Sequence, residues 1–282
     1  MRNLFYILKS HLKTPHYILK NIVWRFPKTI SQLEVVFIMG TPRSGTTLLQ
    51  KTVEAHTSLF SIEGETAIFS FQNFWEANRF HFRLEKEKRD YYLNQARDNV
   101  DFFSKCVNYL SSLNSNKIFV EKTPQHIKHL GFLIKHFPKA KFVHIVRDGR
   151  DCFCSARLHP FIPQSKSIIT FSKYYDYCLK QGIEFYDHEQ VYTLKYEDFV
   201  ADPKQHLKKL MNFMNLKLED QKLMVSSRSS DKRAKLNQLN KLNEPISNVS
   251  VERWRNELSK NELKRFNTYS KKVLCFFGYP LS

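Results

Sequence analysis

The sequence has little glycine and no long apolar segment. Its 282 residues include only 7 glycines, and no tract rich in Gly, Pro or Ser divides the chain. We therefore expect one domain, residues 34–282, preceded by a basic amphipathic extension, residues 1–33. The extension mixes Leu, Ile and Phe with Lys and Arg every few residues. It therefore lacks both the roughly 20 apolar residues that span a bilayer and the apolar core of a secretory signal.

Cysteine is also scarce and irregularly spaced. The five cysteines include no Cys-x-x-Cys pair, which argues against a disulfide framework and against a zinc site. We expect a reducing, cytoplasmic environment and no bound metal. The five are Cys106, Cys152, Cys154, Cys178 and Cys275.

Positive charge, by contrast, is abundant. Forty-five Lys and Arg residues face 27 Asp and Glu residues, a formal net charge of +18. Such an excess predicts an anionic partner: a nucleotide, nucleic acid, an acidic substrate or anionic lipid. In the extension, Leu4, Ile7, Leu8 and Leu12 recur at helical spacing beside lysines. This pattern predicts a helix that packs on the domain or, as a peripheral contact, lies on a membrane surface.

Four short apolar runs predict strands buried on both faces. They cover residues 35–39, 118–120, 142–146 and 191–194. Helical patterns alternate with them, including a long helical region around residues 85–110, so we expect an α/β fold with a mostly parallel sheet between helices. In such sheets, ligands bind beyond the carboxyl ends of the strands.

The first of these strands is followed by a sequence with the Gly-x-x-x-x-Gly skeleton of a phosphate-binding loop, Gly40 to Thr47. Its two glycines permit backbone conformations that direct N–H groups at an anion, and the helix expected near Thr46 adds its N-terminal dipole. Nucleoside triphosphatases have a lysine where this chain has Thr46. Without that lysine, a triphosphate loses a charge-assisted contact of about 1.5–3 kcal/mol. A protein that handles a shorter phosphosulfate chain does not need this contact.

This loop, read with its flanks as VFIMGTPRSGTTLL, resembles the 5′-phosphosulfate loop of the sulfotransferase family, in the form found in its bacterial and protein-tyrosine branch. The resemblance implies a P-loop-type three-layer fold and a sulfuryl donor, 3′-phosphoadenosine 5′-phosphosulfate. It also implies that five consecutive residues hold the 5′-phosphosulfate: Arg43, Ser44, Gly45, Thr46 and Thr47.

A second motif follows the strand at residues 142–146. If a helix begins near Gly149, Ser155 lies on its second turn and faces back toward Arg147. Taken alone, residues 147–151 also fit a solvated charged turn. The motif is similar to the family's 3′-phosphate site, and this resemblance assigns Arg147 and Ser155 to the 3′-phosphate of the nucleotide.

Two further residues are candidates for catalysis. Lys122 lies at the mouth of the strand predicted at residues 118–120, before Thr123 and Pro124, which suit a helix start. The resemblance implies contact between this lysine and the transferring sulfuryl group, whereas the alternative is a surface lysine at a helix start. Glu65 is the candidate base, because it resembles the glutamate of the protein-tyrosine enzymes. Glu63 is a weaker competitor for that role, and Glu65 also fits a helix N-terminal acid.

Residues elsewhere contribute less specific signals. His126 and His129 are predicted to lie on a helix surface. Tyr196 opens a stretch, YEDFVADP, that resembles a family segment leading from a strand into a helix. Arg253, next to Trp254, resembles the basic segment that closes over the nucleotide. Tyr196 and Arg253 therefore complete the expected nucleotide site.

The sequence thus predicts a sulfotransferase whose acceptor hydroxyl or amine is unidentified, with an acidic or a membrane-associated acceptor favoured by the charge and the extension. One alternative is a P-loop kinase, which would need a lysine at position 46 and an acidic strand end for Mg²⁺. The other is a non-enzymatic binder of nucleic acid or anionic surfaces, which would need basic and aromatic residues interleaved on one face. Nucleic acid is not the expected partner, because both phosphate motifs would then be coincidental.

Overall fold

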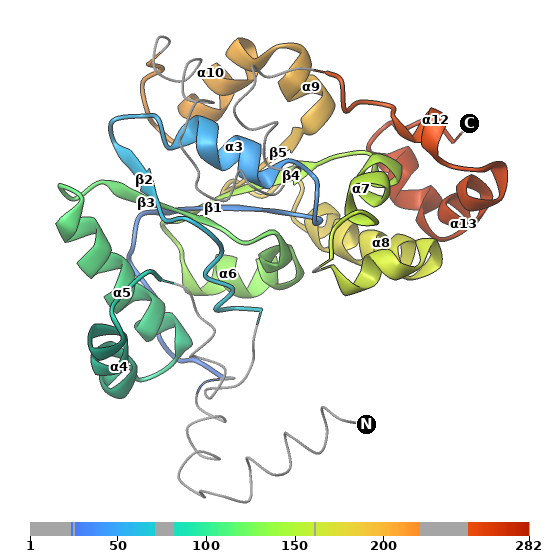
Figure 1. Cartoon of the computed structure of the whole chain (residues 1–282). Coiled ribbons are helices and arrows are strands. Elements are labelled where there is room, and N and C mark those ends of the chain that lie inside the picture. Colours follow the sequence, from blue (N-terminus) through green and yellow to red (C-terminus); the bar gives the residue numbers. More distant parts are fainter. Residues whose placement is uncertain (1–23, 25, 71–81, 161, 220–247, 282) are drawn as a thin grey trace, which may run out of the picture.

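A central sheet of five parallel strands organises the chain (Figure 1). The computed structural model describes residue 24 and residues 26–70, 82–160, 162–219 and 248–281. The strand order across the sheet is β2-β3-β1-β4-β5. The strands are β1 (Val35–Gly40), β2 (Leu59–Ser61), β3 (Ile118–Lys122), β4 (Lys141–Val146) and β5 (Val191–Lys195).

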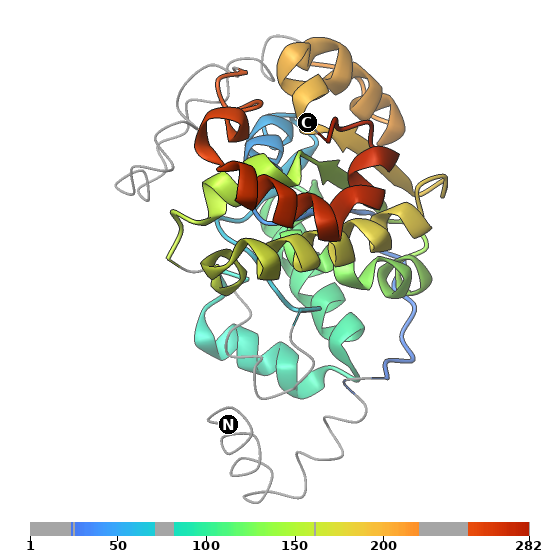
Figure 2. The ribbon, with the colours of Figure 1, turned by 90° about the vertical axis from the view of Figure 1, so that its right-hand side faces the viewer.

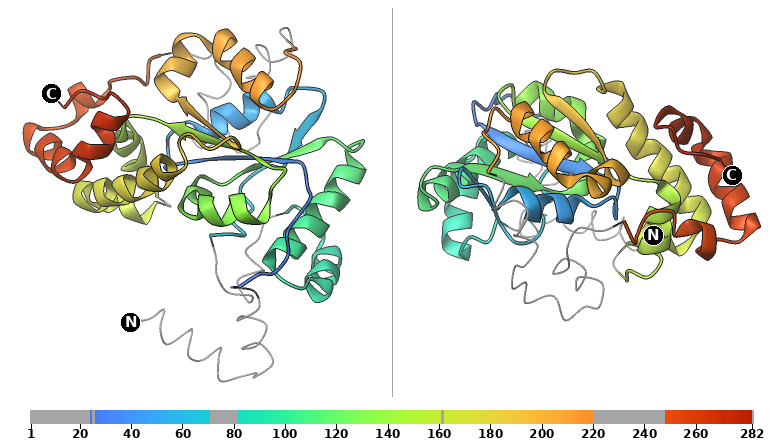
Figure 3. Two further views of the ribbon diagram at one scale, coloured as in Figure 1. Left: turned by 180° about the vertical axis from the view of Figure 1, so that it is seen from behind. Right: turned by 90° about the horizontal axis from the view of Figure 1, so that it is seen from above.

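Helices cover both faces of the sheet (Figures 1 and 3). One face carries α3 (Thr46–Val53), α9 (Tyr196–Ala201) and α10 (Pro203–Phe213). The opposite face carries α4 (Lys86–Gln95), α5 (Asn99–Leu113), the 3₁₀ helix η2 (Pro124–His129), α6 (Leu130–His136) and part of α8 (Ile168–Glu184). The three layers predicted from the alternation of strands and helices are therefore confirmed.

A further group of helices lies beside the carboxyl end of β4. It comprises α7 (Gly149–Ala156), a short 3₁₀ turn η3 (Pro163–Lys166), α12 (Trp254–Glu257) and α13 (Lys260–Phe276). In Figure 2 the long C-terminal helix α13 runs alongside α8, on which it packs. A capping box between Ser259 and Glu262 starts α13.

Successive residues of β1 pack into different cores, as expected for a strand covered on both faces. Val36 and Ile38 face the core beneath α3 and α10. Phe37 faces the opposite core, where its ring lies 5.5 Å from that of Phe103 and 5.4 Å from that of Phe142. The β-branched and aromatic residues that predicted this strand are therefore its packing surface.

The long helical region expected around residues 85–110 is interrupted at Asp98. The Asp98 carboxylate caps α5 by accepting a hydrogen bond from the N–H of Asp101 at 2.9 Å. It also accepts hydrogen bonds from the N–H groups of Lys28 and Thr29, each at 3.1 Å. One buried carboxylate therefore starts a helix and attaches residues 28–29 to the domain.

Little of the predicted N-terminal extension can be compared with the structure. The predicted amphipathic helix at residues 4–12 lies outside the described residues. Residues 26–33 run along the domain, where the N–H of Ser31 donates to the carbonyl of His136 at 2.8 Å. None of the helices described here is long and apolar enough to cross a membrane.

Candidate functional site

The predicted site residues gather at one edge of the sheet. Because all five strands are parallel, their carboxyl ends share that edge, and each is followed by one of the predicted groups. Glu65 follows β2, Lys122 ends β3, and the phosphate loop follows β1. Arg147 follows β4, and Tyr196 follows β5. In the strand order, β3 with Lys122 lies directly beside β1 and its phosphate loop, and β2 with Glu65 lies beyond β3. Arg147 lies on the other side of the loop, after β4.

The loop after β1 has the backbone of an anion-binding turn. Arg43 (φ 71°) and Gly45 (φ 102°) both occupy the left-handed region, and α3 begins at Thr46. Such conformations turn successive N–H groups toward one point. A Cβ atom on Gly45 would lie 2.5 Å from Cδ2 of Tyr196, so glycine is required there for space as well. Within the described chain, the buried Ser44 hydroxyl has no hydrogen-bond partner. A bound anion would supply one.

Arg147 and Ser155 both contact the loop, although about a hundred residues separate them from it. The Arg147 Nη1 donates to the carbonyl of Arg43 at 3.1 Å, and the Arg43 Nε donates to the Ser155 hydroxyl at 2.9 Å. The Arg147 guanidinium also lies 4.4 Å from the ring centre of Tyr196. Its Nε is buried and has no hydrogen-bond partner among the described residues. The two predicted phosphate motifs therefore form one connected cluster.

Positive charge accumulates in this cluster. Burial lowers the pKa of Arg43, and the neighbouring guanidinium groups of Arg147 and Arg253 lower it further. Arg253 itself pairs with Glu257, its Nε lying 2.6 Å from a carboxylate oxygen. Like charges held this close favour binding of an anion, because the anion relieves their mutual repulsion.

A buried carboxylate attaches the C-terminal segment to the same cluster. Asp151, in the first turn of α7, accepts hydrogen bonds from the N–H groups of Glu252 at 2.8 Å and Trp254 at 3.0 Å. The Trp254 indole is buried, with the Arg150 guanidinium 3.8 Å from its ring centre. Trp254 is therefore a core residue. Burial raises the pKa of Asp151 to about 6.

The two predicted catalytic residues contact each other. The Lys122 ammonium, 6% exposed, lies 3.0 Å from a carboxylate oxygen of Glu65, which is 44% exposed. Glu63 is directed elsewhere, because it pairs with Arg83 at 3.4 Å. Of the two candidate bases, Glu65 is thus the one beside the lysine. The pair thus places an accessible carboxylate beside a buried cation. A carboxylate in such a place can accept a proton from a substrate, and the cation can stabilise negative charge that develops next to it.

The prediction for His126 was wrong. Its side chain is fully buried, and its Nδ1 lies 2.9 Å from a carboxylate oxygen of Glu121. The Thr123 hydroxyl also bonds to Glu121 and makes no cap for the helix that follows it. Sequence reasoning missed Glu121. The available signal was its place two residues after Phe119, where the strand's alternation puts an acid on the core face.

Comparison with known proteins places the chain in a family. A family model described as "Sulfotransferase family" matches residues 35–220, which include β1 to β5.

The chain belongs to the sulfotransferase family.

One relative in this family is protein-tyrosine sulfotransferase 1 of Danio rerio, 28% identical over 211 residues. The match covers 67% of this chain and 55% of the relative, so the chain spans about half of that protein's length. Solved structures agree on the fold. The sulfotransferase domain of the Synechococcus PCC 7002 olefin synthase matches with a TM-score of 0.72 at 20% identity, over 92% of this chain and 99% of that one. A mouse sulfotransferase solved with PAP matches with a TM-score of 0.58 at 15% identity, over 92% of this chain and 89% of that one.

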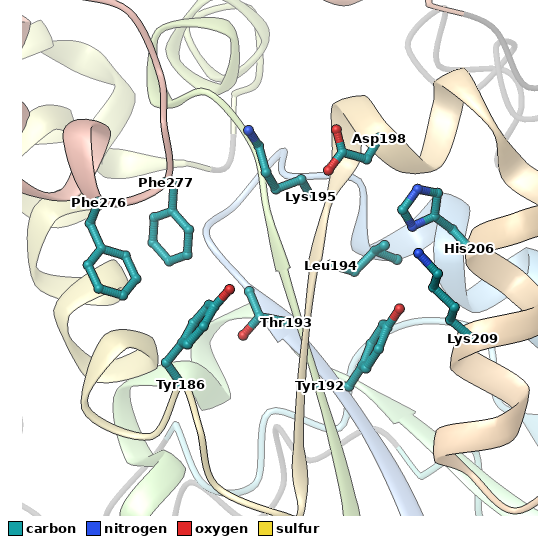
Figure 4. Close-up of a pocket in the computed structure, with 10 residues that line it drawn as sticks. All are labelled: Tyr186, Tyr192, Thr193, Leu194, Lys195, Asp198, His206, Lys209, Phe276 and Phe277. Atoms are coloured by element: carbon teal, nitrogen blue, oxygen red, sulfur yellow. The ribbon is translucent and has the colours of Figure 1, made fainter.

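A distinct pocket of about 220 Å³ lies along the outer edge of β5. Figure 4 shows it between Phe276 and Phe277 on one side and His206 and Lys209 of α10 on the other. None of the predicted site residues lines it. The predicted site residues instead surround the carboxyl ends of the strands. Across the described residues, no group of three His, Cys, Asp or Glu side chains is placed to hold a metal.

Proposed function

We propose that this protein is a sulfotransferase that uses 3′-phosphoadenosine 5′-phosphosulfate as donor. The observation that carries the proposal is the connected cluster of two anion-binding motifs, joined by the hydrogen bonds of Arg43 to Ser155 and of Arg147 to Arg43. Two anion sites this close suit a nucleotide with phosphates at both the 3′ and 5′ positions. Family membership supports the same donor.

The residues present fit such a nucleotide. Ser44 offers a buried hydroxyl and Arg147 a buried N–H, each without a partner in the described structure. The residues that would hold the 5′-phosphosulfate are Arg43, Ser44, Gly45, Thr46 and Thr47. Those that would hold the 3′-phosphate and the rest of the nucleotide are Arg147, Ser155, Tyr196 and Arg253.

The donor, when bound, supplies an activated sulfuryl group, and Glu65 and Lys122 act on either side of its transfer. Glu65, exposed at the strand ends, accepts the proton of the acceptor hydroxyl as its oxygen bonds to sulfur. The bond between sulfur and the 5′-phosphate oxygen would break in the same step, with 3′-phosphoadenosine 5′-phosphate as the leaving group, and Lys122 would present its ammonium to that oxygen as negative charge develops there. In the structure the ammonium is paired with Glu65, so acceptor and donor must enter beside this pair.

We further propose an acidic acceptor. The formal net charge of +18 raises the local concentration of anionic molecules at the surface. An acidic tyrosine peptide should therefore be a better acceptor than its neutral counterpart at low ionic strength. The advantage should shrink as salt is added, because the Debye length falls to about 3 Å at 1 M ionic strength and charges farther apart are then screened. Equal rates for the two peptides at all salt concentrations would contradict this.

Calorimetric titration tests the donor site. The protein should bind 3′-phosphoadenosine 5′-phosphate with a dissociation constant in the micromolar range, about −8 kcal/mol, and should not bind ATP with Mg²⁺ comparably. Ser155→Ala and Arg147→Ala should weaken binding, whereas Arg97→Ala should not, because Arg97 is 74% exposed and paired with Asp101. A preference for ATP, or no binding by folded protein, would contradict the proposal.

A further inference from the structure

Directly beside the Glu65 and Lys122 pair lies a buried acid that the proposed chemistry does not use. Glu121 precedes Lys122 in β3 and is 1% exposed. Across the sheet it is paired with Phe37 of β1, and in its own strand it stands between Val120 and Lys122. Burying a carboxylate among such residues is unfavourable unless its oxygens are satisfied.

Three side chains satisfy Glu121. Its Oε1 accepts hydrogen bonds from the hydroxyls of Thr66 at 2.8 Å and Thr123 at 2.6 Å. Its Oε2 accepts from Nδ1 of His126 at 2.9 Å. These hydrogen bonds offset the cost of burying the carboxylate.

The partners of Glu121 also bind the backbone that follows Glu65. The Thr123 hydroxyl accepts the N–H of Ala67 at 3.1 Å. Nε2 of His126 lies 3.3 Å from the N–H of Phe69 and accepts its hydrogen bond, so the ring proton is on Nδ1 and points at Glu121. The two N–H groups whose hydrogen bonds Thr123 and His126 accept therefore belong to the segment that follows Glu65.

That segment has a backbone conformation that needs support. Ala67 has φ 54°, in the left-handed region that residues with a Cβ seldom adopt. Such conformations persist where surrounding contacts fix them. Thr66, Ala67 and Phe69 each make one of the hydrogen bonds described above.

We propose that Glu121 is a positioning residue: through Thr66, Thr123 and His126 it fixes the strand end that carries Lys122 to the segment that carries Glu65. Glu65 is followed immediately by Thr66, and Lys122 stands between Glu121 and Thr123, so both members of the pair adjoin the network. Its catalytic importance rests on the proposed function. The geometry of the network does not, because it concerns the contact between two side chains of this chain.

The reactivity of Lys122 measures how well the pair is held together. A water-soluble N-hydroxysuccinimide ester labels accessible lysines, and peptide mass spectrometry gives the rate at Lys122. Lys122 should react slowly in the wild type, since it is buried and paired with Glu65. Glu121→Gln should increase the rate about tenfold, the factor expected from the loss of one good hydrogen bond. The amide has one acceptor oxygen where the carboxylate has two, so it cannot accept from Nδ1 of His126 and also from the two threonine hydroxyls on the opposite oxygen. Glu65→Gln, which removes the ion pair itself, sets the upper limit.

Thr123 provides the variants that separate positioning from loss of stability. Thr123→Ser keeps the hydroxyl and should label like the wild type, whereas Thr123→Val removes it and should label faster. Thr193→Val is the matched control, because the buried hydroxyl of Thr193 in β5 has no hydrogen-bond partner in the described structure. Affinity for 3′-phosphoadenosine 5′-phosphate should change less than twofold in both Thr123 variants, since Thr123 follows β3 whereas the nucleotide cluster follows β1, β4 and β5.

The outcomes distinguish the two proposals. Equal labelling of Lys122 in Thr123→Val, Thr123→Ser and Thr193→Val would overturn the positioning role. Unchanged labelling in Glu121→Gln would do the same. Failure of the wild type to bind the bisphosphate nucleotide would instead remove the proposed function and leave the labelling result standing.

Discussion

Replacing Gly45 by alanine should lower the free energy of unfolding by about 2–5 kcal/mol. Gly45 has φ 102°, and forcing an alanine into the left-handed region costs roughly 1–2 kcal/mol. The new Cβ would also lie 2.5 Å from Cδ2 and 2.9 Å from Cε2 of Tyr196. Overpacking of this kind typically costs about 1–3 kcal/mol, because the ring or the loop must move.

Gly278→Ala is a matched control for the backbone contribution. Gly278 follows α13 with φ 72°, and no atom lies within 4 Å of a Cβ placed there. Its alanine variant therefore incurs the conformational cost alone, about 1–2 kcal/mol. The difference between the two variants measures the contact of Gly45 with Tyr196.

Urea unfolding followed by circular dichroism, extrapolated linearly to water, gives both values. In a Tyr196→Ala background, where the ring is absent, Gly45→Ala should be no more destabilising than Gly278→Ala. Gly45→Ala should also weaken binding of 3′-phosphoadenosine 5′-phosphate, since the loop N–H groups would rotate away from the anion. Equal destabilisation by the two glycine variants in the wild-type background would refute this reasoning.

Three other predictions concern buried polar groups. Burial raises the pKa of Asp151 to about 6, so between roughly pH 4 and pH 6 the folded protein holds a proton that the unfolded chain has released. The wild type should therefore lose stability relative to Asp151→Asn as the pH rises through this range. Urea unfolding at pH 4.5 and 7 measures the difference. Gly182→Ala should cost about 1–3 kcal/mol, because its Cβ would lie 2.2 Å from Cε1 of the buried His144, and an unchanged melting temperature would contradict this. Asp98→Ala should lower the free energy of unfolding by at least about 0.5–2 kcal/mol, the cost of a lost helix cap, and should speed hydrogen exchange at the N–H of Thr29. Faster exchange in α5 alone would show that other contacts hold residues 28–29.

The sequence predicted most of the sheet because four of its strands are continuous apolar runs. It missed β2, since Leu59–Ser61 is only three residues long and too short to show a pattern. The boundary between α4 and α5 was also missed. Asp98 was visible as a potential cap, but its role depends on hydrogen bonds from Lys28 and Thr29, about 70 residues away.

The sequence predicted the individual residues of the site but not the contacts between them. A parallel sheet brings its strand ends together, so the residues chosen from separate motifs could be expected at one edge. The contact between Glu65 and Lys122 follows from strand order, with β2 next to β3, which a pattern of single residues does not specify. His126 was misplaced for a similar reason: a helical segment that follows a strand turns one side inward, and the spacing alone did not identify which.

The order of the strands has a consequence for how this protein can diverge. The predicted donor contacts follow β1, β4 and β5, whereas the exposed carboxylate of Glu65 follows β2 at the opposite margin of the sheet. We therefore expect substitutions in the segments after β2 and β3 to alter which acceptor is recognised while the predicted nucleotide contacts stay intact. Exchanging those two segments between members of the family should thus transfer acceptor preference as a unit, provided that the Glu121 network is carried with them.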